Sequence, residues 1–156
     1  MKPKIGEKAP AFCLLDAYEN KKCLDEFKGK WVILYFYPKD NTPGCTLEAM
    51  DFSDLKQEFE KQGAVILGIS KDSCKSHQEF IDKRGLTITL LSDPEAEVQK
   101  KYDVYALKKF MGREFMGTLR TTFIIDPQGK VQKIWDSVTV KGHAKDVLNE
   151  LLSIKP

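Results

Sequence analysis

The sequence of 156 residues predicts an α/β fold in which a mixed central β-sheet carries helices on both faces. Two continuous apolar runs, at 31–37 and 64–70, have the length and β-branched content of strands buried on both faces. The segment between them places apolar residues at helical spacing from 45 to about 61, and Gly63 ends it. A strand, a helix and a second buried strand form a βαβ unit with a right-handed crossover. We expect this unit at the centre of one domain that spans 1–156.

The segments before the first buried strand are expected to be extended or short. Residues 1–10 are interpreted as a lead-in, 12–15 as a short strand, and 23–27 as a short strand or helical turn. We interpret Cys13 as a small core residue and Cys23 as a structural residue.

The elements after the βαβ unit are expected to alternate between helices and strands. They are a helix at 74–84, capped by Asp72-Ser73 and ended by Gly85, then a strand within 86–92, then a helix that Asp93-Pro94 starts and that runs to about 102. Serine and aspartate favour the cap position, proline the first helical position, and glycine the position after the last turn.

The C-terminal part is expected to form two antiparallel strands, at 120–126 and 131–135, followed by a helix. The residues expected on its inner side are Val147, Leu148, Leu151 and Leu152. His143, at the start of this helix, is interpreted as a surface or capping residue. The complete order of elements is typical of a thioredoxin-like fold.

Residues 103–119 mix bulky apolar side chains with glycines and charges, which predicts a loop with a short extended piece. We expect its phenylalanines and methionines to cover the core. The alternative is an exposed rim that admits an apolar substrate or a partner.

Composition excludes several classes of function. The net charge is +2 and the charges are mixed along the chain, so neither nucleic acid nor an anionic membrane is an expected partner. No apolar run approaches 18 residues, and the first residues lack the apolar core of a signal peptide. The cytoplasm is therefore the expected location.

Four cysteines are present, Cys13, Cys23, Cys45 and Cys74, and no two of them form a C-x-x-C pair. A zinc site therefore has little support, and no metal or cofactor is expected. A disulfide framework is not expected in a reducing compartment either.

Cys45 follows the first buried strand through a turn that delivers it to the start of a helix. Pro38 ends the strand, Thr42 is a candidate N-cap, and Pro43 suits the first helical position. A thiol in the first turn faces unpaired backbone N–H groups and the positive end of the helix dipole, and both favour the thiolate. Half ionisation at neutral pH requires about 2 kcal/mol, whereas the dipole supplies about 0.3–1 kcal/mol. A nearby cation must supply the rest, and Arg120 is the candidate.

The motif Pro38-x-x-x-Thr42-x-x-Cys45 resembles the active-site pattern of the peroxiredoxins, and the wider stretch 35–48 is similar to their bacterioferritin comigratory protein branch, also called the Q type. The resemblance implies a thiol peroxidase. Its Cys45 thiolate would attack hydrogen peroxide or an organic hydroperoxide and become a sulfenic acid. Thioredoxin or another thiol would then recycle it, in a monomer or at most a weak dimer.

The resemblance also implies the role of each neighbour. The Thr42 hydroxyl and the backbone N–H of Cys45 would donate to the peroxide oxygens. Arg120 would stabilise both the thiolate and the leaving oxygen, and Pro38 would keep water away. Glu48 would orient Arg120, although it also fits as an ordinary charge in the first helical turn.

Turnover requires a second thiol. Many members of the branch carry a resolving cysteine five residues after the first, where this chain has Met50. Cys74, which opens the next helix, is a candidate resolving residue. An external thiol and, with less support, Cys13 or Cys23 are the alternatives.

Two other cysteine chemistries are excluded by single positions. A cysteine-dependent phosphatase requires an arginine where this chain has Asp51, and a thioredoxin requires a second cysteine where it has Leu47 or Glu48. A non-catalytic thioredoxin-fold binding or chaperone module is the remaining alternative. Replacing Cys45 with serine would leave the function of such a module intact. The same replacement would abolish the activity of a peroxidase.

Overall fold

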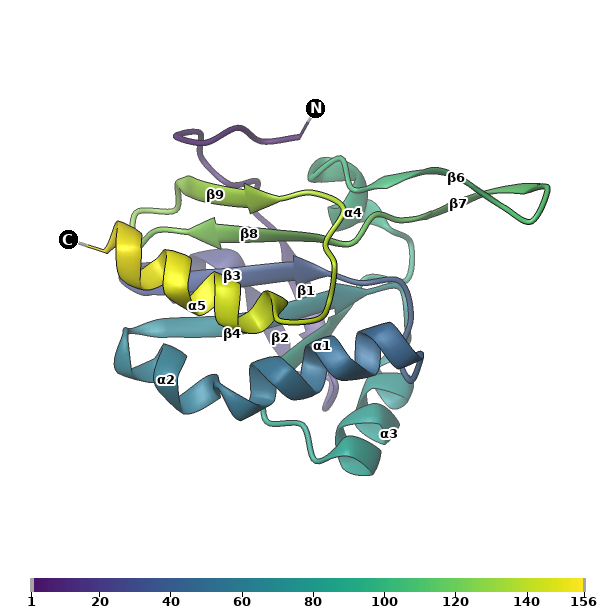
Figure 1. Cartoon of the computed structure of the whole chain (residues 1–156), viewed down its shortest axis with the longest axis horizontal. Coiled ribbons are helices and arrows are strands. Elements are labelled where there is room, and N and C mark those ends of the chain that lie inside the picture. The colour runs from purple at the N-terminus through teal and green to yellow at the C-terminus, as the bar shows by residue number, and fades with distance from the viewer. Residues whose placement is uncertain (1, 156) are drawn as a thin grey trace.

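A seven-stranded mixed β-sheet forms the centre of the molecule, in the order β2-β1-β5-β4-β3-β8-β9 (Figure 1). The computed structural model describes residues 2–155. The strands are β1 (Cys13–Asp16), β2 (Lys21–Cys23), β3 (Trp31–Phe36), β4 (Ala64–Ser70), β5 (Thr89–Ser92), β8 (Thr121–Ile125) and β9 (Val131–Trp135). Strands β3, β4 and β5 are parallel, whereas β1 and β8 pair antiparallel with β5 and β3.

Helices cover both faces of this sheet, as predicted. They are η1 (Leu24–Phe27), α1 (Pro43–Asp54), α2 (Lys56–Lys61), α3 (Cys74–Arg84), α4 (Glu97–Lys101) and α5 (His143–Ile154). Helices α1, α2, α3 and α5 pack against one face, while α4 and η1 contribute to the core on the other.

Alternate residues of β3 enter the two cores. Ile33 and Tyr35 pack under α1 and α5, whereas Val32, Leu34 and Phe36 point into the opposite cluster. Because successive side chains of a strand point to opposite faces, a strand covered on both sides must be apolar throughout. This explains the continuous apolar run in the sequence.

Two predicted helices begin or continue differently in the structure. The helix expected at 45–61 is divided at Leu55 into α1 and α2. The helix expected from Pro94 begins only at Glu97, because Ala96 adopts the left-handed region with φ 56°. Asp93 still caps it from a distance, since its carboxylate accepts the N–H groups of the first turn.

The prediction of a loop at 103–119 is wrong. Strands β6 (Tyr105–Phe110) and β7 (Arg113–Thr118) form a hairpin that projects from the body of the molecule (Figure 1). Its turn places Met111 and Gly112 at φ 51° and 78°, the conformation that two-residue hairpin turns require. The prediction that these apolar side chains cover the core is also wrong, since Phe110 and Met111 are 66% and 86% exposed.

Two predictions for the last helix are also wrong. His143 is buried, and its Nε2 lies 2.8 Å from the hydroxyl of Thr122 on β8. Burial lowers the pKa of His143 to about 4, so its imidazole is neutral at physiological pH. Leu152, expected on the inner side, is exposed, while Val147 and Leu151 are buried.

The prediction that Cys13 is a core residue is wrong, and so is the expectation of no structural disulfide. Cys13 is exposed, and it forms a disulfide with Cys23. The two residues lie directly opposite each other on β1 and β2, with a ten-residue separation in sequence. Only the register of this hairpin brings them together, so their spacing alone carried no signal.

Candidate active site

Cys45 lies in the first turn of α1, which follows the carboxyl end of β3. Thr42 is the N-cap residue with extended backbone, and Pro43 occupies the first helical position. The Thr42 carbonyl accepts the N–H of Thr46 at 2.8 Å, but its hydroxyl donates to the carbonyl of Lys39, also at 2.8 Å. The predicted helix start is therefore present, and the Thr42 side chain closes the preceding turn. Cys45 itself is only 1% exposed.

The Arg120 guanidinium joins Cys45 to Glu48. Its Nη2 donates to Cys45 Sγ at 3.2 Å, and its Nη1 donates to Glu48 Oε1 at 2.7 Å. Arg120 immediately precedes β8, and Thr121 of β8 pairs with Phe36 at the end of β3. The antiparallel pairing thus carries an arginine 75 residues distant in sequence to the thiol.

Burial and charge oppose each other within this group. Burial raises the pKa of the Glu48 carboxyl to about 7, although Arg120 acts to lower it. Burial alone would lower the pKa of Arg120, but Glu48 and Cys45 outweigh it and hold that pKa above its ordinary value. Arg120 is therefore charged, and it is the cation in contact with the thiol. Glu48 Oε2 is buried without a hydrogen-bond partner, so this carboxyl is held through one oxygen.

Gly44 allows the guanidinium to approach the helix start. A Cβ added at this position would lie 3.3 Å from Arg120 Nη2 and 3.9 Å from a methyl group of Val140. The distance to Nη2 is shorter than an ordinary van der Waals contact, so any side chain here would displace Arg120. The sequence analysis did not single out this glycine, because its neighbours come from distant segments.

A buried polar network ties the turn before Cys45 to α3. Tyr37 donates its hydroxyl to Asp40 at 2.6 Å, and Ser76 donates to the same carboxylate at 2.8 Å. His77 places Nδ1 2.7 Å from Asp40 and Nε2 2.9 Å from the carbonyl of Leu91. These contacts fix the turn that carries Pro38 and Cys45. The sequence analysis missed them, since a lone histidine on a helix gives no signal of its partner.

Lys108 brings the projecting hairpin to the edge of the site. Burial and the neighbouring Arg120 lower the pKa of Lys108, whereas Cys45 acts to raise it. Its Nζ donates to the carbonyl of Thr118 at 2.8 Å. The hairpin therefore carries a second cation whose pKa responds to the charges of Arg120 and Cys45, which the prediction of a loop could not reveal.

Pro38 and Cys74 complete the predicted set. Pro38 is half-buried in the turn after β3. Cys74 is the first residue of α3 and is half-buried, but it lines a cavity of about 520 Å³ together with Cys13, Glu19 and Ser92. The structure thus brings Cys45, Glu48 and Arg120 together and directs Cys74 toward β1.

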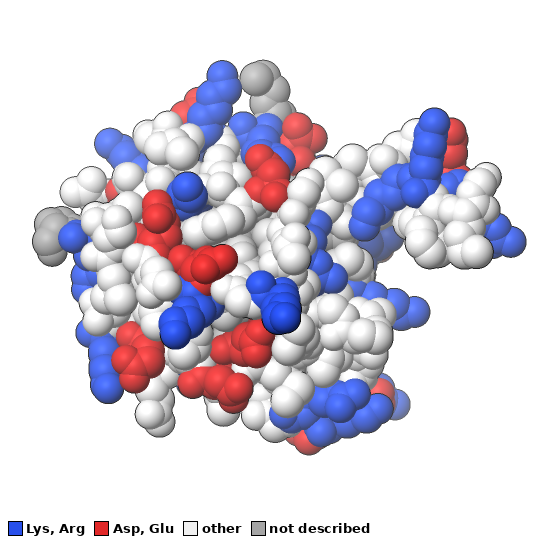
Figure 2. All heavy atoms as spheres, viewed as in Figure 1, with Lys and Arg blue, Asp and Glu red and all other residues white. Residues whose placement is uncertain are grey.

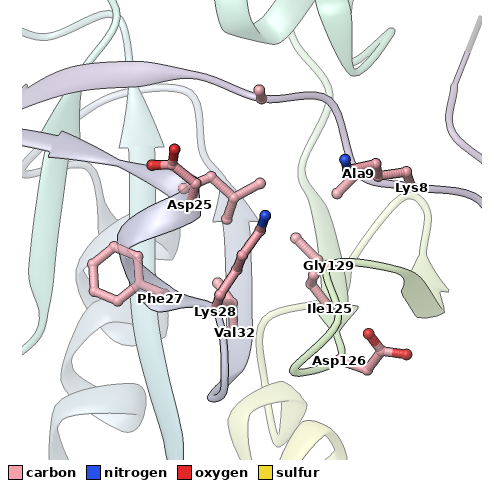
Figure 3. Close-up of a pocket in the computed structure, with 11 residues that line it drawn as sticks. Lys8, Ala9, Asp25, Phe27, Lys28, Val32, Ile125, Asp126 and Gly129 are labelled. Atoms are coloured by element: carbon pink, nitrogen blue, oxygen red, sulfur yellow. The ribbon is translucent and has the colours of Figure 1, made fainter.

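A further cavity, of about 190 Å³, lies at the opposite end of β3 (Figure 3). It is lined by Val32 at the start of that strand, by Ile125 at the end of β8, and by Lys28 and Asp126. Its lining contains no residue of the site around Cys45. Within residues 2–155 there is no group of three potential metal ligands, and no helix is long and apolar enough to cross a membrane.

A buried thiol beneath a guanidinium, on a mixed sheet of this topology, is the arrangement of a thiol-based redox enzyme. The sequence model described as the AhpC/TSA family matches residues 5–134. The chain is 44% identical to peroxiredoxin Bcp of Bacillus subtilis over 148 residues, which cover 95% of this chain and 94% of the relative. It is 46% identical to peroxiredoxin Bcp of Xanthomonas campestris over 123 residues, covering 79% and 77%.

Solved structures give the same result. The bacterioferritin comigratory protein of Xanthomonas campestris superposes with a TM-score of 0.90 at 39% identity, covering 96% of this chain and 98% of that one. A mutant of PrxQ from Xylella fastidiosa superposes with a TM-score of 0.93 at 38% identity, covering 98% of both. The chain therefore belongs to the AhpC/TSA family, as a peroxiredoxin of the Bcp or Q type. The predictions of a thioredoxin-like fold and of a thiol peroxidase are confirmed.

Proposed function

We propose that this peroxiredoxin reduces hydroperoxides, alkyl hydroperoxides among them, through a Cys45 thiolate. The observation that carries the proposal is the contact of 3.2 Å between Arg120 Nη2 and Cys45 Sγ. A guanidinium at this distance favours the charged nucleophile and cannot itself lose its proton at physiological pH. The Xanthomonas campestris relative is described as having alkyl peroxide reduction activity, which supports this substrate class.

In the proposed reaction the Cys45 sulfur attacks one oxygen of the peroxide. A sulfur–oxygen bond forms, the oxygen–oxygen bond breaks, and its electron pair leaves on the distal oxygen, which takes a proton to become water or an alcohol. Cys45 becomes a sulfenic acid. Charge moves from sulfur to the leaving oxygen, so Arg120 and the backbone N–H of Cys45 stabilise the transition state without moving.

Two neighbours shape this step. The Thr42 hydroxyl lies in the turn immediately before the helix, where it donates to the carbonyl of Lys39, and its O–H would rotate away from that carbonyl to donate to the bound peroxide. Half-buried Pro38 would exclude water from the thiolate. Glu48 is a positioning residue, because it touches Arg120 and holds the guanidinium over the sulfur.

Cys74 is the proposed resolving residue. Cys45 and Cys74 open helices that follow neighbouring parallel strands, β3 and β4. Parallel strands lie about 4.8 Å apart, so the two helix starts share one edge of the sheet. Because Cys45 is buried and Cys74 faces β1, the first turns must unwind before the sulfurs can bond. Resolution by an external thiol is the alternative outcome.

The remaining features of the proposal concern the surroundings of the enzyme. The recycling partner would be thioredoxin or another thiol reductant, and the chain would act as a single domain, 1–156, in a cytoplasmic monomer. Figure 2 shows acidic and basic side chains intermixed on the face formed by α1, α2 and α5, which gives no support for a nucleic-acid or membrane partner there.

The test is a single turnover followed by mass spectrometry. Reduced protein receives one equivalent of an alkyl hydroperoxide, and its intact mass and peptides are compared with those of Cys45→Ser. Loss of two hydrogens, or gain of one oxygen on Cys45, is expected in the wild type only. If the wild type consumes the peroxide no faster than Cys45→Ser does, the proposed peroxidase reaction is wrong. A non-catalytic binding module would then explain the protein better.

A further inference from the structure

All four cysteines lie along one edge of the sheet, where the parallel strands end. Cys45 follows β3 and Cys74 follows β4. Leu15 of β1 pairs with Ser92, the last residue of β5, so Cys13 lies two residues beyond the end of β5 on the same edge. The order of strands, β3-β4-β5-β1-β2, therefore places the cysteines in the order Cys45, Cys74, Cys13 and Cys23.

The four also share one face. Leu90 of β5 packs in the cluster beneath α1 and α3, and Ser92, two residues later, points to the same side. Leu15, opposite Ser92, and Cys13, two residues before it, point there too, while Leu14 packs in the opposite cluster. The disulfide is thus on the side of the sheet where α3 begins.

The cavity at the start of α3 connects Cys74 with this disulfide. Cys13, Cys74 and Ser92 all line it. The side chain of Ser92 contacts Cys74 from the β5 side. Cys13 is exposed, whereas Cys45 is 1% exposed. An external reductant can therefore reach the sulfur of Cys13 but not that of Cys45.

We propose that Cys13 and Cys23 form a dithiol relay that carries electrons from an external dithiol to the Cys45–Cys74 disulfide. This inference rests on the proposed function, which supplies that disulfide. The pair, of which Cys13 is exposed and Cys23 half-buried, is the docking point of the reductant, and Cys74 is the link between the surface and the buried thiol.

Each step of the relay is a thiol–disulfide exchange. The Cys13 thiolate attacks Cys74 Sγ, the Cys45–Cys74 bond breaks, and Cys45 leaves as a thiolate. The Cys23 thiolate then attacks Cys13 Sγ, and Cys74 leaves and takes a proton. The product is the Cys13–Cys23 disulfide, the state that the structure holds. An external dithiol of the thioredoxin class reduces it, so two electrons enter for each peroxide.

The position of Arg120 gives the first exchange its direction. A thiol leaves more readily from a disulfide when its thiolate is stabilised. Cys45 has the guanidinium 3.2 Å from its sulfur, whereas Cys74 has the carboxylates of Glu19 and Asp16 nearby. An attack on Cys74 that expels Cys45 is therefore favoured over the reverse attack.

The experiment traps the intermediate between two cysteines. Fully reduced Cys23→Ser receives one equivalent of peroxide, is quenched with an alkylating reagent, and is mapped without reduction. Serine cannot displace Cys13, so a Cys13–Cys74 disulfide is expected to accumulate. Cys13→Ser is the matched control, in which the Cys45–Cys74 disulfide should persist.

The location of the disulfide in the wild type tests the relay without replacing Cys13 or Cys23. After full reduction and one equivalent of peroxide, the disulfide should be found at Cys13–Cys23, with Cys45 and Cys74 as thiols. In Cys74→Ser the same treatment should leave Cys13 and Cys23 reduced. In steady state with thioredoxin as the dithiol, Cys13→Ser should turn over about tenfold more slowly than the wild type.

Two results would overturn the relay and leave the peroxidase intact. One is a stable Cys45–Cys74 disulfide in Cys23→Ser and in the wild type. The other is a lasting sulfenic acid on Cys45, which removes Cys74 from the cycle as well. Failure of the proposed function looks different, because then the peroxide remains unconsumed and Cys45 stays a thiol in every variant.

Discussion

Cys45 and Cys74 occupy similar places in the backbone but differ in their surroundings. Each lies in the first turn of a helix that follows one of two adjacent parallel strands. Cys45 is buried and accepts a hydrogen bond from the Arg120 guanidinium. Cys74 is half-buried beside carboxylates, and burial and Glu19 raise the pKa of its thiol. A helix N-terminus therefore does not by itself make a reactive cysteine. The neighbouring side chains, a guanidinium at Cys45 and carboxylates at Cys74, distinguish the two thiols.

The largest expected effect comes from removing the cation at Cys45. Arg120→Met should lower the second-order rate constant for peroxide by about 10²–10³, as expected for loss of a main donor to the developing charge. Stopped-flow measurements compare it with Arg113→Met, which changes an exposed arginine of the hairpin. Equal rates for the two variants would contradict the role of Arg120.

The pH dependence of stability tests the burial of Glu48. The folded-state pKa of about 7 lies above the ordinary value of 4.5, so the carboxyl stabilises the fold fully below about pH 4.5. That contribution, about 3 kcal/mol, is lost as the pH rises from about 4.5 through 7. Urea unfolding of the wild type and Glu48→Gln should show this difference. Parallel pH profiles would mean that the pKa of Glu48 is the same in the folded and unfolded protein.

The close approach at Gly44 should matter less than the charges. In Gly44→Ala, Arg120 must shift by a few tenths of an ångström to clear the new methyl group. We expect the rate with peroxide to fall about tenfold, because small misplacements at a reacting centre are costly. Pro43→Ala, a change at the exposed preceding residue, is the control and should retain most activity. An unchanged rate for Gly44→Ala would show that the guanidinium tolerates displacement.

The smallest expected effect would make Cys74 resemble Cys45 more closely. Glu19→Gln removes a charge that raises the pKa of Cys74, so more thiolate is present at neutral pH. Formation of the Cys45–Cys74 disulfide should accelerate about twofold to threefold. The control is Glu79→Gln, which changes an exposed carboxylate on α3, the helix that Cys74 opens, and it should have no effect. Slower formation in Glu19→Gln would mean that the carboxylate assists resolution.

Local sequence predicted the parts of the fold that depend on neighbouring residues. The apolar run of β3, the Ser73 cap of α3 and the Gly85 end of that helix lie where the patterns placed them. Predictions failed where distant segments decide. Ala96 delays α4, and the hairpin β6–β7 extends outward, so its apolar side chains do not cover the core.

The same division holds at the site. The motif with Pro38, Thr42 and Cys45 is contiguous, and so the sequence alone predicted a nucleophile and identified the family. The meeting of Arg120 with Cys45 and Glu48 depends on the pairing of β8 with β3. The network of Asp40 with His77 depends on the packing of α3.

The sequence by itself determined the chemistry of this protein, because a turn, a helix cap and a thiol interact over a few residues. Tertiary structure alone decided the surroundings of the other cysteines. Sheet order placed Cys74 toward β1, and strand register joined Cys13 to Cys23. Such contacts arise from the packing of whole elements, and no local pattern in the chain encodes them.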